Sequence, residues 1–445
     1  MLELNQKLIC EENDMKFTAA GDAIIQRRIQ EKFAGYEEIR PFVMQGDARF
    51  FNLETTLNYE GECPASQFSG GTYIRSVPEI LDDLKKFGFN MATANNNHAL
   101  DFSYEGLERT RVSLDESGLV HAGIGRNLAE ASAPRYLDTP NGRVALIAVN
   151  TTFDAPMMAG KQTERVKGRA GINGLRIAQR LTVNSEELKY IRSLADRIGI
   201  NVSNNISRRE GYYPDLADNE AEFGTLKFTL GEETKRSLVP NESDMKRVER
   251  SIYEAKLQSD YIMISLHSHQ IDGKTKEDVP IFLSNISHRF IDMGADAIIG
   301  HGPHLLRPIE VYNNKPIFYC LGDFILELYS IDFAPDDFFI KYGLEANSDT
   351  VHSLLKKRSQ DFTVGLMEDR KMMETVIPLW ETDDKRDLVS LKLLPIELGR
   401  KCKKSDEGLP RKAKNCELVE RLAEISKPYG IEMTLEADGT VSCKW

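Results

Sequence analysis

Short apolar runs alternate along the chain with amphipathic stretches. The apolar runs, which predict strands, are at positions 16–20, 47–54, 89–94, 142–150, 259–269 and 294–304. Residues 78–88 have helical spacing, with Pro78 at the start and Gly88 at the end, where each residue suits a helix best. Residues 104–118 predict a second helix. Strands that alternate with helices of ~10–15 residues predict a layered α/β fold, with β-sheets flanked by helices.

Polar residues gather where several of these predicted strands end. Asp22 follows the first apolar run, residues 52–54 end the second, and residues 95–98 follow the third. In open α/β sheets, ligands bind beyond the carboxyl ends of the strands. Residues that are far apart in the sequence are therefore expected to meet in one site at these ends.

The charge balance limits the kinds of partner. The chain has 445 residues, with 57 Lys and Arg against 69 Asp and Glu, so its formal net charge is −12. Nucleic acid and membrane surfaces need a basic face, so we expect neither nucleic-acid binding nor membrane insertion. An anionic substrate, either a small molecule or a peptide, would have to be held locally by a metal or by a few Arg and Lys side chains. The oligomeric state is left open.

The sequence gives no sign of export. It contains no apolar run of roughly 18 residues. Residues 1–16 carry acidic side chains in place of the apolar core of a signal peptide. The six cysteines form no C-x-x-C pair, which in a chain of this length favours free thiols in a reducing compartment. The predicted location is the cytoplasm.

Three segments differ from the alternating pattern. Residues 151–225 are polar and rich in loops, and we expect such an insert to form a lid over an active face. Residues 331–390 are also polar, and they are predicted to be a variable, solvated connection. Residues 391–445 predict a strand, a helix and a hairpin around Asp438-Gly439, which would complete the main domain.

Histidines are concentrated at the predicted strand ends. Of the eight in the chain, four end apolar strands, and a fifth, His269, lies two residues beyond one of them. A single histidine in such a place more often caps a loop, but here carboxylates and an amide occupy equivalent positions. Mixed ligands of this kind suit one or two divalent ions, Mn, Fe or Zn before Ca or Mg. The candidate metal ligands are Asp22, Glu54, Asn97, His267, His301 and His304.

Several motifs resemble those of the CapA family and follow one another in the family's order. They are AAGDAI (19–24), NLETTL (52–57), ATANNNHALDF (92–102), LHSHQ (266–270) and GHGPHLLRPIEVYNNKPIFYCLGDFI (300–325). CapA-like proteins are of the poly-γ-glutamate-synthesis type and have a calcineurin-like metallophosphoesterase fold. The resemblance implies that residues 16–330 form one such domain, with an active site at the carboxyl ends of its strands.

The resemblance also implies a role for each matching position. Asp22 is similar to the first-strand aspartate that binds a metal, and Glu54 stands where the fold places its metal-bridging acid. Asn97 resembles the amide ligand of the family. The positions that resemble the imidazole ligands are His267, His301 and His304. The implied catalytic residues, which donate or accept protons or polarise the substrate, are His98, His269 and Asp101.

Some positions depart from the patterns that the resemblance implies. Ile24 occupies the place of the histidine in the D-x-H motif of metallophosphoesterases in general, and the closing histidines are spaced H-x-x-H, as in CapA-like proteins, rather than H-x-H as in the general pattern. Gln270 stands where similar sequences have Glu, and Asp323 stands where Asn is usual. One or two metals, and more than one chemistry, are therefore compatible with the sequence.

Arginines are the residues expected to hold the anionic group of a substrate. Arg75, Arg169 and Arg176 are the candidates, because a guanidinium fork matches a carboxylate or a phosphate at two points. Ordinary surface ion pairing would explain each of these residues equally well.

Three functions are compatible with these residues. The first is a metal-dependent hydrolase of a phosphoester or of an amide-type or peptide-type anionic substrate, in which His98 protonates the leaving group. The second is a metal-dependent peptide or amino-acid epimerase, in which His98 and His267 or His269 exchange a proton at an α-carbon. The third is a non-catalytic accessory protein that binds polyglutamate. The ionisable residues at the strand ends favour an enzyme, since a binding module needs none of them.

Overall fold

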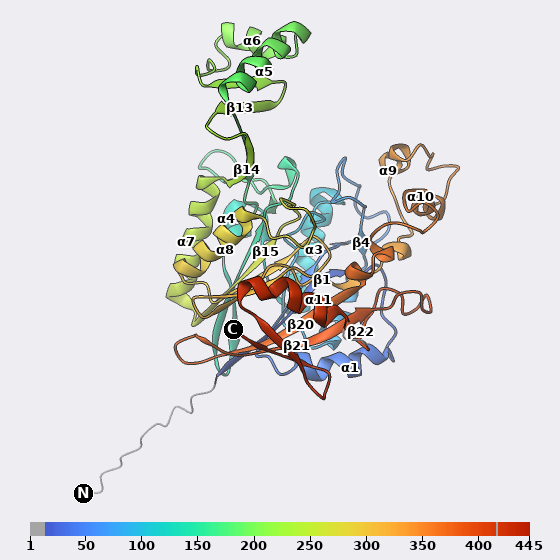
Figure 1. The fold of residues 1–445 in the computed structure, drawn as a ribbon. Coiled ribbons are helices and arrows are strands. Elements are labelled where there is room, and N and C mark those ends of the chain that lie inside the picture. The colour runs from blue at the N-terminus through green and yellow to red at the C-terminus, as the bar shows by residue number, and fades with distance from the viewer. Residues whose placement is uncertain (1–13, 415–416) are drawn as a thin grey trace, which may run out of the picture. The chain divides into compact units, whose positions relative to one another are not determined.

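The chain folds into two compact units. The structure, a computed structural model, describes residues 14–414 and 417–445. The described residues up to Leu175 and from Lys246 onward form the main unit, and Arg176–Met245 form the small unit (Figure 1). All of the candidate site residues except Arg176 belong to the main unit.

The first sheet of the main unit has ten strands. They are β1 (Met15–Ile24), β2 (Ala48–Leu53), β5 (Met91–Thr93), β6 (Val120–Ala122), β19 (Asp323–Leu326), β20 (Glu374–Thr382), β21 (Leu388–Leu398), β22 (Pro410–Lys412), β23 (Glu432–Leu435) and β24 (Val441–Lys444). The order is β23-β24-β21-β20-β1-β2-β5-β6, with β19 beside β1 and β22 beside β21. β1, β2, β5 and β6 are parallel, whereas β20 is antiparallel to β1.

The second sheet has six strands. They are β8 (Arg135–Thr139), β9 (Gly142–Asn150), β15 (Tyr261–His267), β16 (Ala297–His301), β17 (Ile309–Tyr312) and β18 (Lys315–Phe318). Their order is β17-β18-β16-β15-β9-β8, and β9, β15, β16 and β18 run parallel. His267 is in register with both Asn150 and His301, so these three strands end at the same level.

One apolar core fills the space between the two sheets. Phe17 and Phe50 of the first sheet share it with Leu146, Met263 and Ile299 of the second. Side chains alternate across a strand, so the neighbouring residues of the first sheet point to its other face. There they pack against helices α1 (Ala34–Val43), α2 (Ile80–Lys86) and α3 (Ser103–Ser117).

The second sheet is also accompanied by helices. Helix α8 (Ile281–Met293) lies beside β16, and its Arg289 pairs with Glu249 of α7 (Glu242–Gln258). The layers are therefore helix, sheet, sheet and helix, which confirms the predicted layered α/β fold. The remaining short elements of the main unit are β3 (Thr56–Leu57), β4 (Arg75–Ser76), β7 (Ile124–Gly125), α4 (Leu128–Ser132), β10 (Gly171–Ile172), α9 (Asp336–Lys341), α10 (Val351–Arg358) and α11 (Glu417–Ser426), with 3-10 turns at 155–157, 328–330, 366–368, 370–373 and 427–429.

The small unit has a sheet and a core of its own. Its elements are β11 (Ile177–Val183), α5 (Ser185–Ile198), α6 (Val202–Arg209), β12 (Glu220–Phe223), β13 (Leu226–Leu230) and β14 (Lys235–Pro240). The bounds differ from the predicted insert at 151–225, because the unit begins at Arg176 and continues to Met245. The residues that precede Arg176 contact the second sheet instead. For example, the backbone N–H of Leu175 donates to the carbonyl of Asn150, the last residue of β9, at 2.7 Å. A lid function stays a prediction.

The prediction of a solvated connection at 331–390 is wrong for its second half. Residues 374–382 form β20, a buried strand between β1 and β21, and Trp380 stacks on Phe17 with ring centroids 5.1 Å apart. The C-terminal segment contains a strand, a helix and a hairpin in the predicted order, and they join the same first sheet.

Four of the six cysteines lie among the described residues. Cys63, Cys320, Cys402 and Cys443 are free thiols, while Cys10 and Cys416 lie outside the described residues. No helix in residues 14–414 and 417–445 has the length and apolar character that a membrane crossing requires.

Helix α2 carries several charged side chains, and one of them, Asp83, is buried. Its carboxylate is fully buried and accepts hydrogen bonds from Arg28 Nε at 2.6 Å, from the backbone N–H of Ile29 at 3.0 Å and from Lys86 Nζ at 3.2 Å. Burial alone would raise the pKa of Asp83, but these donors outweigh it and lower the pKa. The carboxylate therefore stabilises the fold in its ionised form.

Asp83→Asn is expected to lower the free energy of unfolding by about 1–2 kcal/mol at pH 7, since the variant loses charge-assisted hydrogen bonds. A pKa that is lower in the folded state gives stability that is present above the unfolded pKa and is lost as the pH falls through the folded pKa. The difference between variant and wild type should therefore vanish in acid. Urea unfolding at several pH values measures it, with the exposed neighbour Asp82→Asn as control. An equal loss in both variants would contradict the prediction.

Candidate metal centre

Asp22 lies inside β1 rather than after its end. The strand was expected to stop at Gly21-Asp22, but a bulge after Asp22 lets it continue to Ile24 between β2 and β19. A Cβ at Gly21 would lie 1.8 Å from the carbonyl oxygen of Gly322, so only glycine allows this approach. Asp22 is fully buried and accepts hydrogen bonds from Asn52 Nδ2 at 2.6 Å and from the Gly302 N–H at 3.0 Å. Burial, together with the nearby Asp323, raises the pKa of Asp22 to about 7.

Glu54, directly after β2, is the least satisfied carboxylate of the cluster. It is fully buried, and neither oxygen has a hydrogen-bond partner among the described residues. Three imidazole nitrogens face its Oε1, namely Nε2 of His98 at 3.8 Å and Nε2 of His267 and of His269, each at 3.9 Å. Burial raises the pKa of Glu54 well above its ordinary value. A buried carboxylate is costly unless a cation or donors compensate for it, and a metal ion at this point would do so.

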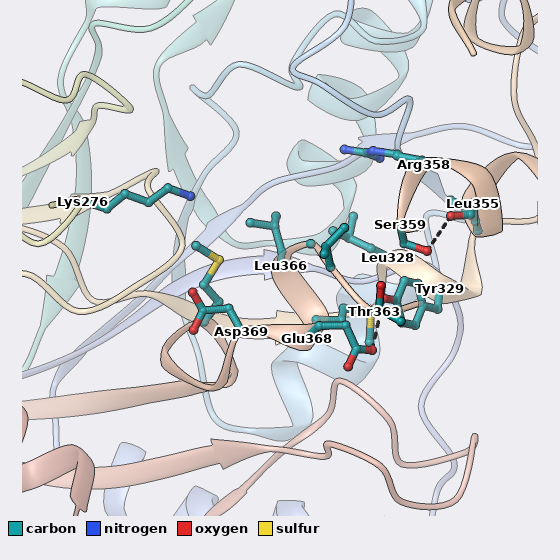
Figure 2. Close-up of a pocket in the computed structure, with 14 residues that line it drawn as sticks. Lys276, Leu328, Tyr329, Leu355, Arg358, Ser359, Thr363, Leu366, Glu368 and Asp369 are labelled. Carbon is teal, nitrogen blue, oxygen red and sulfur yellow. Dashed lines mark hydrogen bonds between the residues drawn. The ribbon is translucent and has the colours of Figure 1, made fainter. Parts of the chain in front are cut away.

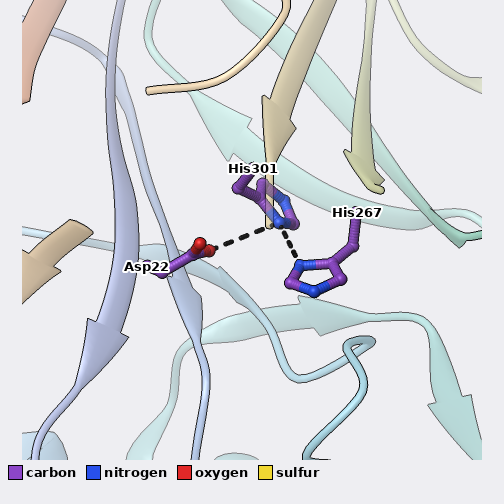
Figure 3. Close-up of side chains that lie close together, drawn as sticks. All are labelled: Asp22, His267 and His301. Atoms are coloured by element: carbon purple, nitrogen blue, oxygen red, sulfur yellow. Dashed lines mark hydrogen bonds and ion pairs between the residues drawn. The ribbon is translucent and has the colours of Figure 1, made fainter. Parts of the chain in front are cut away.

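Asn97 and three histidines converge on the same place. Asn97 Oδ1 lies 2.7 Å from His267 Nε2 and 3.1 Å from His269 Nε2, and these two nitrogens are 3.0 Å apart. The Nδ1 atoms of His267 and His301 are 2.8 Å apart (Figure 3). Burial lowers the pKa of His267 and His269 well below the ordinary value and that of His301 to about 3. Neutral imidazole is the form that binds a metal.

His304 and Asp323 form the other side of the cluster. His304 Nδ1 is 2.9 Å from Asp323 Oδ1 and 4.0 Å from Asp22 Oδ2, and His304 has a positive φ of 64°. Burial opposes the imidazolium, but the carboxylates of Asp323 and Asp22 outweigh it and raise the pKa of His304. Asp323 Oδ2 is buried and has no partner in the part of the chain that is described. Asp323 was not among the predicted ligands, although its place in LGDF, where Asn is usual, was a signal.

His98 and Asp101 form a hydrogen-bonded pair beside Glu54. His98 Nδ1 is 2.7 Å from Asp101 Oδ2. The backbone N–H groups of Ile74 and Gly70 donate to Asp101 at 2.9 and 3.1 Å, and the carboxylate is fully buried. Asp101 therefore fixes the ring so that Nε2 faces Glu54. Asp101 contacts the cluster through His98, and its role as a catalytic residue stays a prediction.

The donor atoms have the spacing of metal ligands. Two groups of three share no residue, and a third group overlaps both of them. Within each group one donor atom per residue lies within 4.8 Å of the others, which suits metal–ligand bonds of about 2.0–2.3 Å. The groups are Asp22, His267 and His301 (Figure 3); Glu54, His269 and His304; and Asp22, Glu54, His304 and Asp323. The two groups without a common residue have enough donors for two neighbouring ions.

A cavity of about 280 Å³ opens onto this cluster at Asn97 and His269. Gly70 forms part of its wall, where a Cβ would lie 2.5 Å from Asn97 Nδ2 and 2.6 Å from His98 Nε2. Any side chain at position 70 would push into the cluster. The other lining residues are Ser69, Thr152, Phe153, Asp154 and Met157.

Gln270 supports the turn that carries His267 and His269. Its Oε1 accepts hydrogen bonds from the hydroxyls of Thr151, Thr152 and Ser268 at 2.7, 2.9 and 2.8 Å. Its Nε2 donates to the carbonyl of Thr151 at 2.6 Å, which an ionised glutamate cannot do. The side-chain amide of Gln270, where similar sequences have Glu, therefore makes a hydrogen bond that an ionised glutamate could not make.

The three candidate arginines are engaged elsewhere. The Arg75 guanidinium lies 5.0 Å from the ring centroid of Phe333, and exposed Arg169 donates to the carbonyl of Met158 at 3.0 Å. Arg176 belongs to the small unit, where it makes a two-point pair with Asp244 at 2.7 and 2.9 Å. As substrate ligands, all three stay predictions.

The fold and the buried cluster define a layered α/β protein with candidate ligands for a divalent ion. Residues 16–327 match the family described as bacterial capsule synthesis protein PGA_cap, and the chain belongs to this family. The resemblance to CapA-like proteins is thereby confirmed.

Known relatives extend the match beyond that segment. Uncharacterized protein y4sH of Sinorhizobium fredii is 31% identical over 432 residues, which cover 94% of this chain and 90% of y4sH. PGA biosynthesis protein CapA of Bacillus subtilis is 35% identical over 292 residues, covering 66% of this chain and 56% of that protein. Capsule biosynthesis protein CapA of Bacillus anthracis is 19% identical over 324 residues, covering 71% and 61%.

Proposed function

We propose that the protein is a metal-dependent hydrolase of a phosphoester or an amide bond in an anionic substrate. The observation that supports this most strongly is Glu54, whose two buried oxygens have no hydrogen-bond partner within the described chain and whose Oε1 faces three imidazole nitrogens. Such an arrangement is costly in a metal-free protein and suits a bound cation. The predicted ligands, with Asp323 added, would hold one or two ions of Mn, Fe or Zn.

The protein's own residues would orient the catalytic histidine and transfer a proton. A divalent cation here would polarise the substrate's phosphoryl or carbonyl oxygen and lower the pKa of a water. His98, fixed through Nδ1 by Asp101, presents Nε2 toward the cluster and would pass a proton to the leaving group. Glycine at position 70 lets Asn97 and His98 keep their places, because a Cβ there would clash with both side chains.

The names of the relatives, together with the resemblance to poly-γ-glutamate-synthesis proteins, favour a polypeptide of Glu or Gln residues as substrate. Two are named for capsule or PGA biosynthesis, and another, of Mycobacterium tuberculosis, is named a probable polyglutamine synthesis accessory protein. An amide bond between glutamyl residues is therefore the preferred target. Because that relative is named an accessory protein, a second candidate function is binding of polyglutamate without turnover. A location in the cytoplasm stays a prediction.

Elemental analysis of the purified full-length protein tests the proposal together with turnover. We expect at least about one equivalent of a divalent transition metal, hydrolysis of p-nitrophenyl phosphate or of a five-residue γ-linked glutamate oligomer, and loss of turnover on chelation with recovery on metal addition. Turnover that is unaffected by metal removal would contradict the proposal. Oligomer binding that survives chelation, without any product, would favour the accessory protein.

The same reactions run in deuterated water address the epimerase alternative. Hydrolysis that releases new termini without deuterium at the α-carbons supports the proposal. Deuterium at an α-carbon without cleavage would replace it with the epimerase.

A further inference from the structure

A second and larger cavity lies next to the metal centre. Its volume is about 560 Å³, in the range of small-molecule sites. The wall is formed by Lys276 and by residues 328–372, including Tyr329 and Arg358 (Figure 2). Apolar side chains supply part of the lining, namely Leu328, Leu355, Leu366, Met367 and Met372.

Lys276 is tied to the loop that carries the closing histidines. Buried Arg307, three residues after His304, donates from Nε to the carbonyl of Lys276 and from Nη2 to the carbonyl of Gln270, both at 2.9 Å. This wall of the cavity is thus held beside the cluster.

The opposite walls are connected to the segments that carry the candidate metal ligands, either along the chain or by a hydrogen bond. Tyr329 follows β19, the strand that begins with Asp323. Arg358, at the end of α10, donates to the hydroxyl of Thr72, in the loop that includes Gly70. Figure 2 shows Lys276 and Arg358 extending into the cavity from different walls. The cavity is thus linked to the segments that carry the candidate metal ligands, although none of those ligands lines it.

Two cations and two acids line this cavity. No hydrogen bond or ion pair with a described residue engages the Lys276 ammonium, and Arg358 has no carboxylate partner in that part of the chain. Both acids accept a hydrogen bond, and Glu368 also lies near a cation outside the lining. Glu368 accepts from the Tyr329 hydroxyl at 3.3 Å and lies 3.8 Å from Arg400, and Asp369 accepts from the Lys371 N–H at 3.0 Å.

We propose that this cavity binds the carboxylates of an acidic oligopeptide and leads its chain to the metal centre. Lys276 and Arg358 would each pair with a carboxylate, and the Leu and Met side chains would cover the methylenes between a carboxylate and the backbone. The inference rests on the proposed function and specifies where its substrate lies. It also assigns the substrate-holding role to cations other than Arg75, Arg169 and Arg176.

Calorimetric titration of the full-length, metal-loaded protein with a five-residue γ-linked glutamate oligomer tests the cavity. Lys276→Gln and Arg358→Gln are each expected to raise the Kd about tenfold, as for loss of one charge-assisted hydrogen bond. Arg358→Lys keeps the charge and should retain more affinity than Arg358→Gln. The matched control is Lys274→Gln, an exposed lysine of the same loop that does not line the cavity, and it should bind as the wild type does.

Wild-type affinity in both Lys276→Gln and Arg358→Gln would overturn the proposal. Equally tight binding of inorganic triphosphate, with the same losses in the variants, would overturn the assignment to carboxylates. Metal content and p-nitrophenyl phosphate turnover, measured on the same samples, separate the two proposals. If variants keep metal and turnover but bind the oligomer normally, the cavity assignment fails alone. If the oligomer binds through these cations in a protein without metal or turnover, the hydrolase proposal fails alone.

Discussion

Glu54→Gln is expected to abolish tight binding of the divalent metal and to lower turnover by about 10³-fold or more, because the metal contributes several kcal/mol of transition-state stabilisation. The amide keeps the size of the side chain but removes the charge that faces His98, His267 and His269. Elemental analysis and initial rates on the same samples measure both effects.

The same substitution should stabilise the metal-free protein. Burial raises the pKa of Glu54 above its ordinary value of 4.5, so the carboxyl group costs stability progressively as the pH rises from the unfolded toward the folded pKa. Glu54→Gln removes this cost. Thermal unfolding in chelator should show no advantage of the variant at low pH and a growing advantage as the pH rises.

Glu116→Gln is a suitable control, since Glu116 is an exposed glutamate of α3. It should change neither metal content nor turnover. Full metal content and full activity in Glu54→Gln would rule out Glu54 as a ligand. A metal-free variant that is less stable than wild type at neutral pH would show that the buried carboxylate is satisfied in some other way.

The second large effect is expected at His98. His98→Gln should lower turnover by about 10²–10⁴-fold while metal content stays at the wild-type level, since the residue is proposed to transfer a proton rather than to hold the ion. Asp101→Asn should reduce turnover less, because the ring remains but loses the carboxylate that orients it at 2.7 Å. Rates at several pH values and elemental analysis distinguish these roles.

His352→Gln provides the matched control, because His352 is an exposed histidine of α10. Loss of metal in proportion to activity in His98→Gln would make His98 a ligand instead of an acid. Unchanged turnover would remove it from the reaction altogether.

The convergence of remote residues could be predicted from the sequence because it follows from strand direction. Glu54 and Asn97 follow parallel strands of the first sheet, and His267 ends a parallel strand of the second. Parallel strands of one sheet end at one edge, so the rule predicts which residues gather in each sheet, while the packing of the two sheets brings the two groups together. The same rule could not find Asp323, which begins β19 instead of ending it and lies beside Asp22 in the parallel pairing. Asp22 itself lies inside its strand, at a bulge that the pattern of apolar and polar residues around it does not predict.

The strand β20 was missed because residues 331–390 were interpreted together as one polar connection, and its sequence also contains a proline. A proline within an apolar run normally argues against an interior strand, since it cannot donate a backbone hydrogen bond. Pro378 directly precedes Leu379, the first residue of β20 that pairs with β1, and lies opposite Leu393 of β21, so no hydrogen bond to β1 is lost. The fit of this proline depends on the register between residues more than 350 positions apart, which local sequence does not reveal.

The place of β20 has a consequence for the order in which the centre can assemble during synthesis. One side of β1 is paired with β2, while its other side is taken by β20 along Met15–Thr18 and by β19 along Asp22–Ile24. A growing chain would hold Asp22 on an unprotected strand edge until residues 323–326 have emerged, and Phe17 would wait for Trp380. The candidate metal ligand nearest the N-terminus would thus be made first and fixed last, so loading of an ion would follow synthesis of β19 and β20.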